Sequence, residues 1–135
     1  MNTKMIRSTT LALVAALSLT AVALPGTALA AKSAKVKVTL KSNGGDFSGR
    51  VKSKSAICIA EREVVVYMQE GSRPNPTTDE EYSSDTSGSD GSWSLGNNRA
   101  TGATFYAHVT KIPGCKAATS KSVTEPEDPF AEEEL

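Results

Sequence analysis

The chain has 135 residues, and its fifteen basic and fifteen acidic side chains give a formal net charge of +0 at pH 7. This balance, with no aromatic residues interleaved among the lysines, argues against a nucleic-acid-binding protein. The two cysteines allow one intrachain disulfide, and no cysteine pair or histidine cluster accompanies them to suggest a zinc site.

Residues 1–30 have the pattern of a secretory signal peptide. Lys4 and Arg7 form a basic head, an apolar run covers residues 11–24, and small residues precede a predicted cleavage after Ala30. A membrane-spanning helix is the alternative, but the run is shorter than the roughly 20 residues that cross a bilayer. Removal of the leader leaves thirteen basic and fifteen acidic residues and no membrane span. We therefore expect a secreted protein, extracellular or associated with the cell wall.

The first two predicted strands have basic outer sides. Residues 31–40 place apolar side chains at 36, 38 and 40 on one side, with Lys35, Lys37, Thr39 and Lys41 on the other, the pattern of a half-buried strand. The sequence Ser-Asn-Gly-Gly-Asp at residues 42–46 predicts a hairpin turn. A second strand over residues 47–52 then turns Arg50 and Lys52 outward.

The segment of residues 57–68 is the one on which the rest of the chain is predicted to pack. Its β-branched run at 64–67 is too short for an amphipathic helix and suits a central strand covered on both sides. Cys58 is predicted to form a disulfide with Cys115, because this pattern is typical of exported chains with two distant cysteines. Free thiols and an intermolecular bond are the alternatives. An intrachain disulfide between Cys58 and Cys115 would raise the free energy of unfolding by about 4 kcal/mol in the chain-entropy model.

The second half of the chain predicts further short strands separated by turns. Two prolines make residues 72–79 a surface loop. An edge strand is predicted at 80–86, a turn at 87–91 and a short strand at 92–95. The next strand, at 103–111, should turn Phe105, Ala107 and Val109 inward and Thr104, Tyr106, His108 and Thr110 outward, and a final strand lies within 117–123.

Together these patterns predict an all-β fold, with residues 31–124 forming a single small immunoglobulin-like β-sandwich of about seven strands and one disulfide. We expect a monomer. The acidic, proline-containing segment of residues 125–135 is predicted to be a disordered tail. The predicted core consists of Phe47, Val64, Val66, Tyr67, Trp93 and Phe105.

Several short motifs occur in an order found in other exported proteins: F-S-G-R-V at 47–51, R-E-V-V-V-Y at 62–67, D-T-S-G-S-D-G-S-W-S at 85–94 and F-Y-A-H-V at 105–109, with Cys58 and Cys115 between and after them. This order resembles a group of small secreted bacterial proteins of unknown function. More loosely, it is similar to transthyretin-like, carboxypeptidase-regulatory-like sandwich modules. The chain departs from those modules by having residues 58–62 where they have a G-x-P connection. The resemblance implies a sandwich without catalytic residues.

Three groups of side chains are candidate sites. The oxygen-rich turn at 85–91 suggests calcium, but its glycine and glutamate spacing is not that of a calcium loop, so a β-turn is the better interpretation. His108 lacks a second histidine and is expected to be an exposed strand residue. Glu61 and Glu63 should share one side of a strand, where a solvated face is the simpler explanation. We therefore expect no enzyme activity, catalytic residue, metal site or cofactor.

The remaining candidate is a basic face on the first two strands. Lys35, Lys37, Arg50 and Lys52 are predicted to hold an anionic cell-envelope polymer or another secreted protein, although lysines that guard strand edges and maintain solubility are the simpler explanation. The predicted function is thus a secreted, non-enzymatic sandwich module, structural or binding at the cell surface. The alternative is a small secreted enzyme or an enzyme inhibitor that presents the loop of residues 72–79.

Overall fold

The computed structural model describes residues 32–96 and 98–130. The predicted signal peptide and the last five residues of the predicted acidic tail lie outside these residues. Within them, no helix is long and apolar enough to span a membrane.

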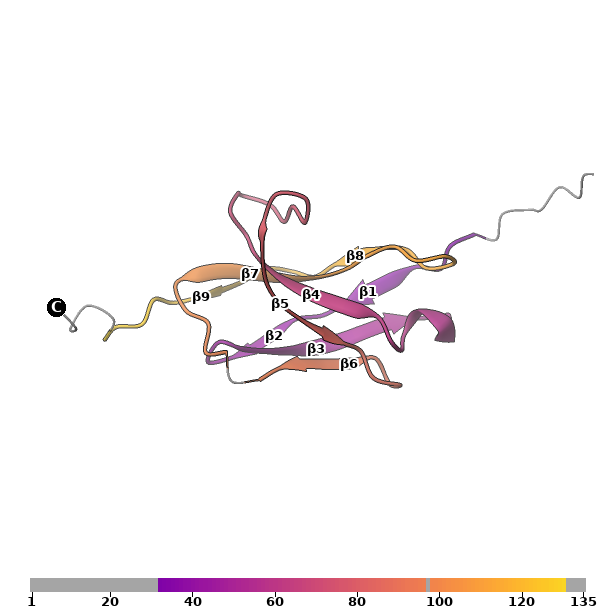
Figure 1. Cartoon of the computed structure of the whole chain (residues 1–135), viewed down its shortest axis with the longest axis horizontal. Helices are drawn as coiled ribbons and strands as arrows, with labels where there is room; N and C mark the ends of the chain where they lie inside the picture. Colours follow the sequence, from indigo (N-terminus) through magenta and orange to yellow (C-terminus); the bar gives the residue numbers. More distant parts are fainter. Residues whose placement is uncertain (1–31, 97, 131–135) are drawn as a thin grey trace, which may run out of the picture.

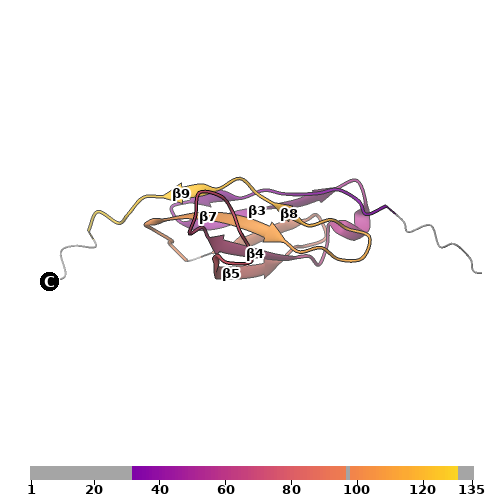
Figure 2. The same ribbon diagram turned by 90° about the horizontal axis from the view of Figure 1, so that it is seen from above.

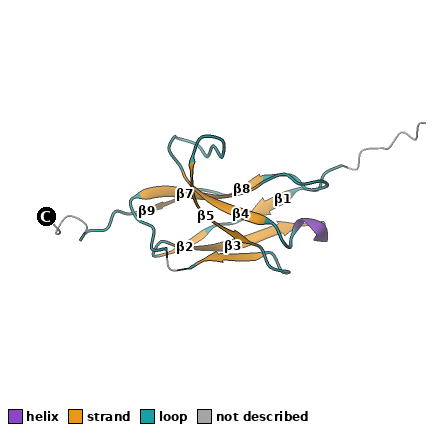
Figure 3. Cartoon of the chain, viewed as in Figure 1, coloured by secondary structure: helices purple, strands orange, loops and turns teal. Residues whose placement is uncertain are grey.

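The described residues form two antiparallel sheets packed face to face, which confirms the predicted all-β sandwich (Figures 1 and 2). One sheet contains β1 (Val36–Val38), β2 (Lys41–Asn43), β3 (Asp46–Ser53) and β6 (Ser92–Leu95). The other contains β4 (Glu63–Met68), β5 (Glu80–Thr86), β7 (Ala103–Val109), β8 (Ala118–Thr119) and β9 (Val123–Glu125). A short 3-10 helix, η1 (Ala56–Cys58), joins β3 to β4 (Figure 3).

The described residues contain nine strands rather than about seven because the final predicted strand is divided and an additional short strand, β2, forms just past the predicted end of the first strand. The final predicted strand is split into β8 and β9, both paired with β7. Strand β9 runs to Glu125, the first residue of the predicted tail, and Gly102 N donates to Pro126 O at 3.0 Å. The sandwich therefore extends into the first residues of the acidic segment.

The edge beside β3 is interrupted at Thr39 and Leu40, between β1 and β2, although both strands keep the same register against β3. Thr39 N donates to Arg50 O at 2.9 Å, while Arg50 N donates to the Thr39 side-chain Oγ1 at 2.9 Å instead of to its carbonyl. A Cβ at Gly49 would overlap the Thr39 carbonyl oxygen, so glycine is needed where the edge strand bends over β3. The bend interrupts the hydrogen-bond ladder between this edge and β3 but does not shift its register.

The hairpin between β2 and β3 lies where the sequence predicts it. Asn43 pairs with Asp46, and the two residues between them, Gly44 and Gly45, have φ values of +61° and +86°. Two consecutive left-handed residues suit the twist of a tight hairpin and favour glycine at both positions. The hairpin fixes the register that sets the lysines of β1 and β2 against β3.

Strand β4 is central, as predicted, since it lies between β5 and β7. Val64, Val65 and Val66 are all buried, so both sides of this strand are covered. Strand β5 is an edge strand, also as predicted. The core between the sheets contains five of the six predicted residues, namely Phe47, Val64, Val66, Trp93 and Phe105.

Two tyrosines differ from their predicted positions. Tyr67, predicted in the core, is only half-buried and lies outside the core cluster. Tyr106, predicted to face outward, is fully buried. The two rings stack with centroids 5.5 Å apart. Tyr106 does lie on the outer side of β7, as alternation predicts. It is buried because the connection between β4 and β5 covers it, and an alternating pattern along β7 cannot reveal such a cover.

The predicted disulfide between Cys58 and Cys115 is present, with the Cα atoms 5.6 Å apart and both residues fully buried. It joins η1 to the turn of residues 112–115. Ala34 pairs with Cys115, and Lys116 N donates to Ala34 O at 2.9 Å, so the start of the sandwich is held at the same end. The bridge therefore connects both sheets to the N-terminal edge.

Candidate functional site

The outer side of the β1–β3–β2 sheet carries the predicted basic residues. Lys37 on β1 lies directly opposite Lys52 on β3, and Arg50 follows on the same side of β3 two residues earlier. Lys35 lies just before β1, where its carbonyl accepts a 2.7 Å hydrogen bond from Ser53 Oγ. The structure thus brings the four predicted residues to one sheet surface, and all four are exposed.

Lys41 on β2 is a further member of this surface, which the alternation turned outward but which was not among the four predicted contact residues. With Arg50 and Lys52 it lines an open hollow of about 380 Å³ whose other lining residues include Ser48 and Ser92. We call Lys35, Lys37, Lys41, Arg50 and Lys52 the basic face. Its cationic side chains surround a surface with hydroxyl groups, a combination suited to anionic oxygens.

One carboxylate of the described chain partly offsets this charge. Asp90 Oδ2 lies 3.4 Å from Arg50 Nη2, and both side chains are largely exposed. Its other oxygen accepts hydrogen bonds from Ser92 Oγ at 2.6 Å and Ser92 N at 3.0 Å. The Ser92 side-chain bond, then the backbone bond, lower the pKa of Asp90 more than Arg50 does. Such an exposed ion pair is weak, so Arg50 can exchange this partner for another anion.

The turn at 87–91 is a β-turn, as preferred over a calcium loop, with Gly91 N donating to Gly88 O at 2.9 Å. Asp85 Oδ2 accepts a 2.8 Å bond from Ser94 N, which links the edge strands β5 and β6. Asp85 and Asp90 therefore bind different partners on strand β6. Within residues 32–96 and 98–130, no three His, Cys, Asp or Glu side chains form a group that could hold a metal ion.

Arg62, directly before β4, is a basic residue that is buried. Its Nη1 donates to Cys58 O at 3.1 Å and its Nη2 to Thr110 O at 2.6 Å. Burial lowers the pKa of its guanidinium from the ordinary value. Arg62 thus supports the disulfide end of the fold from within and is not available to a ligand.

The predicted pair Glu61 and Glu63 does not share one side of a strand. Glu61 lies in the turn before β4 with a φ of +55°, and its backbone N donates to Ser87 O at 2.9 Å. Glu63 is the first residue of β4. The prediction was wrong because the strand starts two residues later than the alternation suggested. Both side chains are exposed.

His108 lies on the outer side of β7, as predicted, but it is half-buried rather than freely exposed. Its Nδ1 lies 2.9 Å from Thr119 Oγ1, and its ring lies 6.3 Å from the ring of Tyr67. Burial lowers the pKa of His108 from the ordinary value. The imidazole is therefore part of the packing between β4, β7 and β8.

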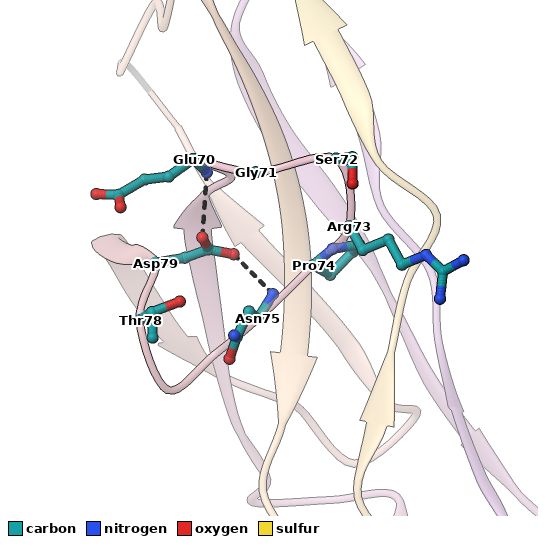
Figure 4. Close-up of a pocket in the computed structure, with 8 residues that line it drawn as sticks. All are labelled: Glu70, Gly71, Ser72, Arg73, Pro74, Asn75, Thr78 and Asp79. Atoms are coloured by element: carbon teal, nitrogen blue, oxygen red, sulfur yellow. Dashed lines mark hydrogen bonds between the residues drawn. The ribbon is translucent and has the colours of Figure 1, made fainter.

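The connection between β4 and β5 is organised by one carboxylate that sequence analysis missed. Asp79 Oδ1 accepts a 3.1 Å bond from Glu70 N, and its Oδ2 accepts 2.7 Å bonds from Asn75 N and from Tyr106 Oη (Figure 4). The bond from Tyr106 is the main cause of a lowered pKa for Asp79. Desolvation, followed by that bond, raises the pKa of Tyr106. One buried side chain thus fixes both ends of the loop.

This loop stands out from the sandwich (Figure 1) and encloses an open hollow of about 620 Å³. The hollow is lined by Glu70, Gly71, Ser72, Arg73, Pro74, Asn75, Thr78 and Asp79. The Arg73 side chain points away from Asp79 (Figure 4). The loop predicted as an inhibitor segment is therefore held at its base and presents an exposed cation.

Comparisons of this chain with protein-family models, with curated proteins and with solved structures give no match in any of the three. The resemblance to transthyretin-like modules stays a prediction. Function is therefore argued from the charges and contacts described above.

Proposed function

We propose that this chain is a secreted, non-enzymatic β-sandwich module that binds an anionic polymer of the cell envelope through its basic face. The observation that carries the proposal is the direct opposition of Lys37 and Lys52. Like charges placed opposite each other destabilise an antiparallel pair. Within the described chain, the basic face is relieved by one weak ion pair, that of Arg50 with Asp90. A bound polyanion would remove this repulsion.

The spacing of the cations favours a polymer over a compact ligand. Lys37 and Lys41 lie four residues apart along one edge that keeps a single register with β3. At about 3.3 Å per residue, their backbones are separated by about 13 Å. Arg50 and Lys52 form a second row beside them. An open surface with two rows of cations suits repeating phosphates or carboxylates along a chain.

Two further observations support the proposal that the chain is a secreted, non-enzymatic module. The disulfide suits an oxidising extracellular environment. The titratable side chains with shifted pKa values inside the fold, Asp79, Tyr106 and Arg62, hold backbone and loop in place. Their roles in packing favour a binding module over an enzyme.

Retention on purified cell-envelope fractions across a range of salt concentrations tests the proposal. We expect retention at low ionic strength that weakens steeply as salt rises, because screening removes attraction between exposed charges. Soluble polyglutamate added as a competitor should release the protein. Absence of retention even at low ionic strength would contradict the proposal.

The loop of residues 69–79 favours a second function, inhibition of an extracellular protease. Three hydrogen bonds to Asp79 and the two prolines restrict this projecting loop, and a loop held in place before binding loses less conformational entropy in a protease cleft. Incubation with a panel of serine, cysteine and metalloproteases tests it. Stoichiometric inhibition that weakens in Asp79→Asn is expected. Inhibition of none of these proteases would remove this candidate.

A further inference from the structure

The end of the sandwich that holds the disulfide exposes two isoleucines. Ile57 in η1 is 70% exposed and Ile112 is 36% exposed, while Cys58 and Cys115 beside them are fully buried. The disulfide between the two cysteines lies in the interior of the fold. The apolar side chains of Ile57 and Ile112 are turned outward.

The two isoleucines belong to adjacent segments. A Cβ at Gly114 would lie 3.5 Å from Ile57 Cδ1, and Ile112 N donates to Cys115 O at 3.2 Å across the same turn. Pro113, which directly follows Ile112, is also exposed. Figures 2 and 3 show η1 and this turn at one end of the molecule. Single exposed apolar residues are common, but neighbouring ones form a patch that suggests an interaction. We call Ile57, Ile112 and Pro113 the apolar tip.

Lysines surround the apolar tip. Lys111 precedes Ile112, and Lys54 lies just before η1. Lys116 is held beside Ala34 by the hydrogen bond from its backbone N to Ala34 O. Ala34 in turn shares an open hollow of about 380 Å³ with Lys32, Lys35 and Lys54. All five lysines are exposed.

Carboxylates near this end lie to one side of the tip. Glu61 is attached to the turn at 87–91 through its backbone bond to Ser87, and Asp90 in that turn pairs with Arg50. The side formed by Lys32, Lys35, Lys54 and Lys116 is therefore cationic. An apolar centre with a cationic border is the surface composition that binds a bilayer interface containing anionic lipids.

We propose that the apolar tip docks on a membrane surface rich in anionic lipid, with Ile57 and Ile112 entering the headgroup layer and the surrounding lysines contacting lipid phosphates. A soluble polyanion would match the lysines but leave the isoleucines in water. This inference goes beyond the polymer-binding function and involves a different part of the molecule, although Lys35 belongs to both surfaces.

Vesicle co-sedimentation of the exported chain, with its N-terminus determined by mass spectrometry, tests the proposal. Vesicles contain phosphatidylcholine alone or with phosphatidylglycerol. We expect binding to the anionic vesicles and little to the neutral ones. The double variant Ile57→Ser with Ile112→Ser should bind at least tenfold more weakly. The variant Lys54→Gln with Lys111→Gln should lose about fivefold for each lysine.

Phe130 supplies a matched control, because it is 74% exposed on the C-terminal segment, which leaves the sandwich at the opposite end (Figure 1). Phe130→Ser should bind anionic vesicles like the unmodified chain. Circular dichroism and intact mass establish that each variant keeps its sheets and its disulfide. Sedimentation velocity reports whether the tip instead joins two copies of the chain.

Four outcomes would overturn the proposal. They are no binding to anionic vesicles, equal binding to neutral ones, unchanged binding of the isoleucine variant, and a dimer that this variant dissociates without any effect on vesicles. The variant Lys37→Gln with Lys52→Gln separates the two functions. It should bind the polymer more weakly and bind vesicles as the unmodified chain does, so that either function can fail alone.

Discussion

Tyr106 Oη lies 2.7 Å from Asp79 Oδ2, although 27 residues separate the two in the chain. This bond connects the middle of β7 to the end of the loop between β4 and β5. Because the Asp79 side chain also accepts from Glu70 N and Asn75 N, one contact ties the whole loop to the sheet.

Tyr106→Phe should lower the free energy of unfolding by about 2 kcal/mol, since it removes a hydrogen bond to a charged group in a buried position. Urea unfolding measures this change. Tyr82→Phe is the matched control, because Tyr82 Oη makes a long 3.4 Å bond to Asn98 O near the surface and should cost little. Equal losses in the two variants would contradict the proposed role of Asp79.

Stability should also depend on the ionisation of Asp79. Its pKa is lowered in the folded state, so the ionised carboxylate stabilises the fold above the ordinary value of 3.8. That contribution should disappear as pH falls from 3.8 through the lowered pKa. The stability advantage of the unmodified chain over Asp79→Asn should therefore be present at pH 6 and decrease below pH 3.8. A constant advantage down to the lowest pH at which the chain folds would refute this linkage.

Gly49 should tolerate no side chain. Gly49→Ala places a Cβ against the Thr39 carbonyl, and the backbone shift that follows should cost about 1–3 kcal/mol. Gly71→Ala is the control, because a Cβ there meets nothing within 4 Å. Thermal unfolding of both variants measures the difference. Equal melting temperatures of the two variants would contradict the role assigned to Gly49 in the bend between β1 and β2.

The disulfide should supply a large share of the stability of this small domain. Replacement of Cys58 and Cys115 by serine should lower the free energy of unfolding by about 4 kcal/mol, because the bridge closes a loop of 57 residues. Urea unfolding of the native and variant chains measures the loss, and titration should find no free thiol in the native chain. An unchanged midpoint would show that packing alone holds η1 to the turn at 112–115.

Sequence alternation located the basic face because the outward positions of two neighbouring strands repeat every second residue. Lys37 and Lys52 follow from this pattern together with the hairpin at Gly44 and Gly45. Lys41 continues the same outward series as Lys35 and Lys37, although it was not among the four predicted contact residues. The edge continues past the bend at Thr39, and this bend depends on the absence of a side chain at Gly49, a contact between strands that neither strand reveals alone.

The remaining errors share a physical cause. Tyr106 was expected to face solvent, since alternation assigns one side of a strand to water. Asp79 and its loop cover Tyr106. The buried Arg62 guanidinium donates hydrogen bonds to the carbonyls of Cys58 and Thr110. These partners come from distant parts of the chain, so local pattern could not supply them.

The salt dependence of binding to purified envelope polymer tests the central claim about the basic face most directly. For Lys37→Gln with Lys52→Gln, we predict weaker binding and a slope of log Kd against log salt that is smaller by about 1.5 to 2, because two fewer counterions are displaced. Arg73→Gln, which removes an exposed cation from the loop on the other sheet, should keep the slope of the unmodified chain. If the double variant instead binds with the same affinity and slope as Arg73→Gln, the basic face is not the binding surface.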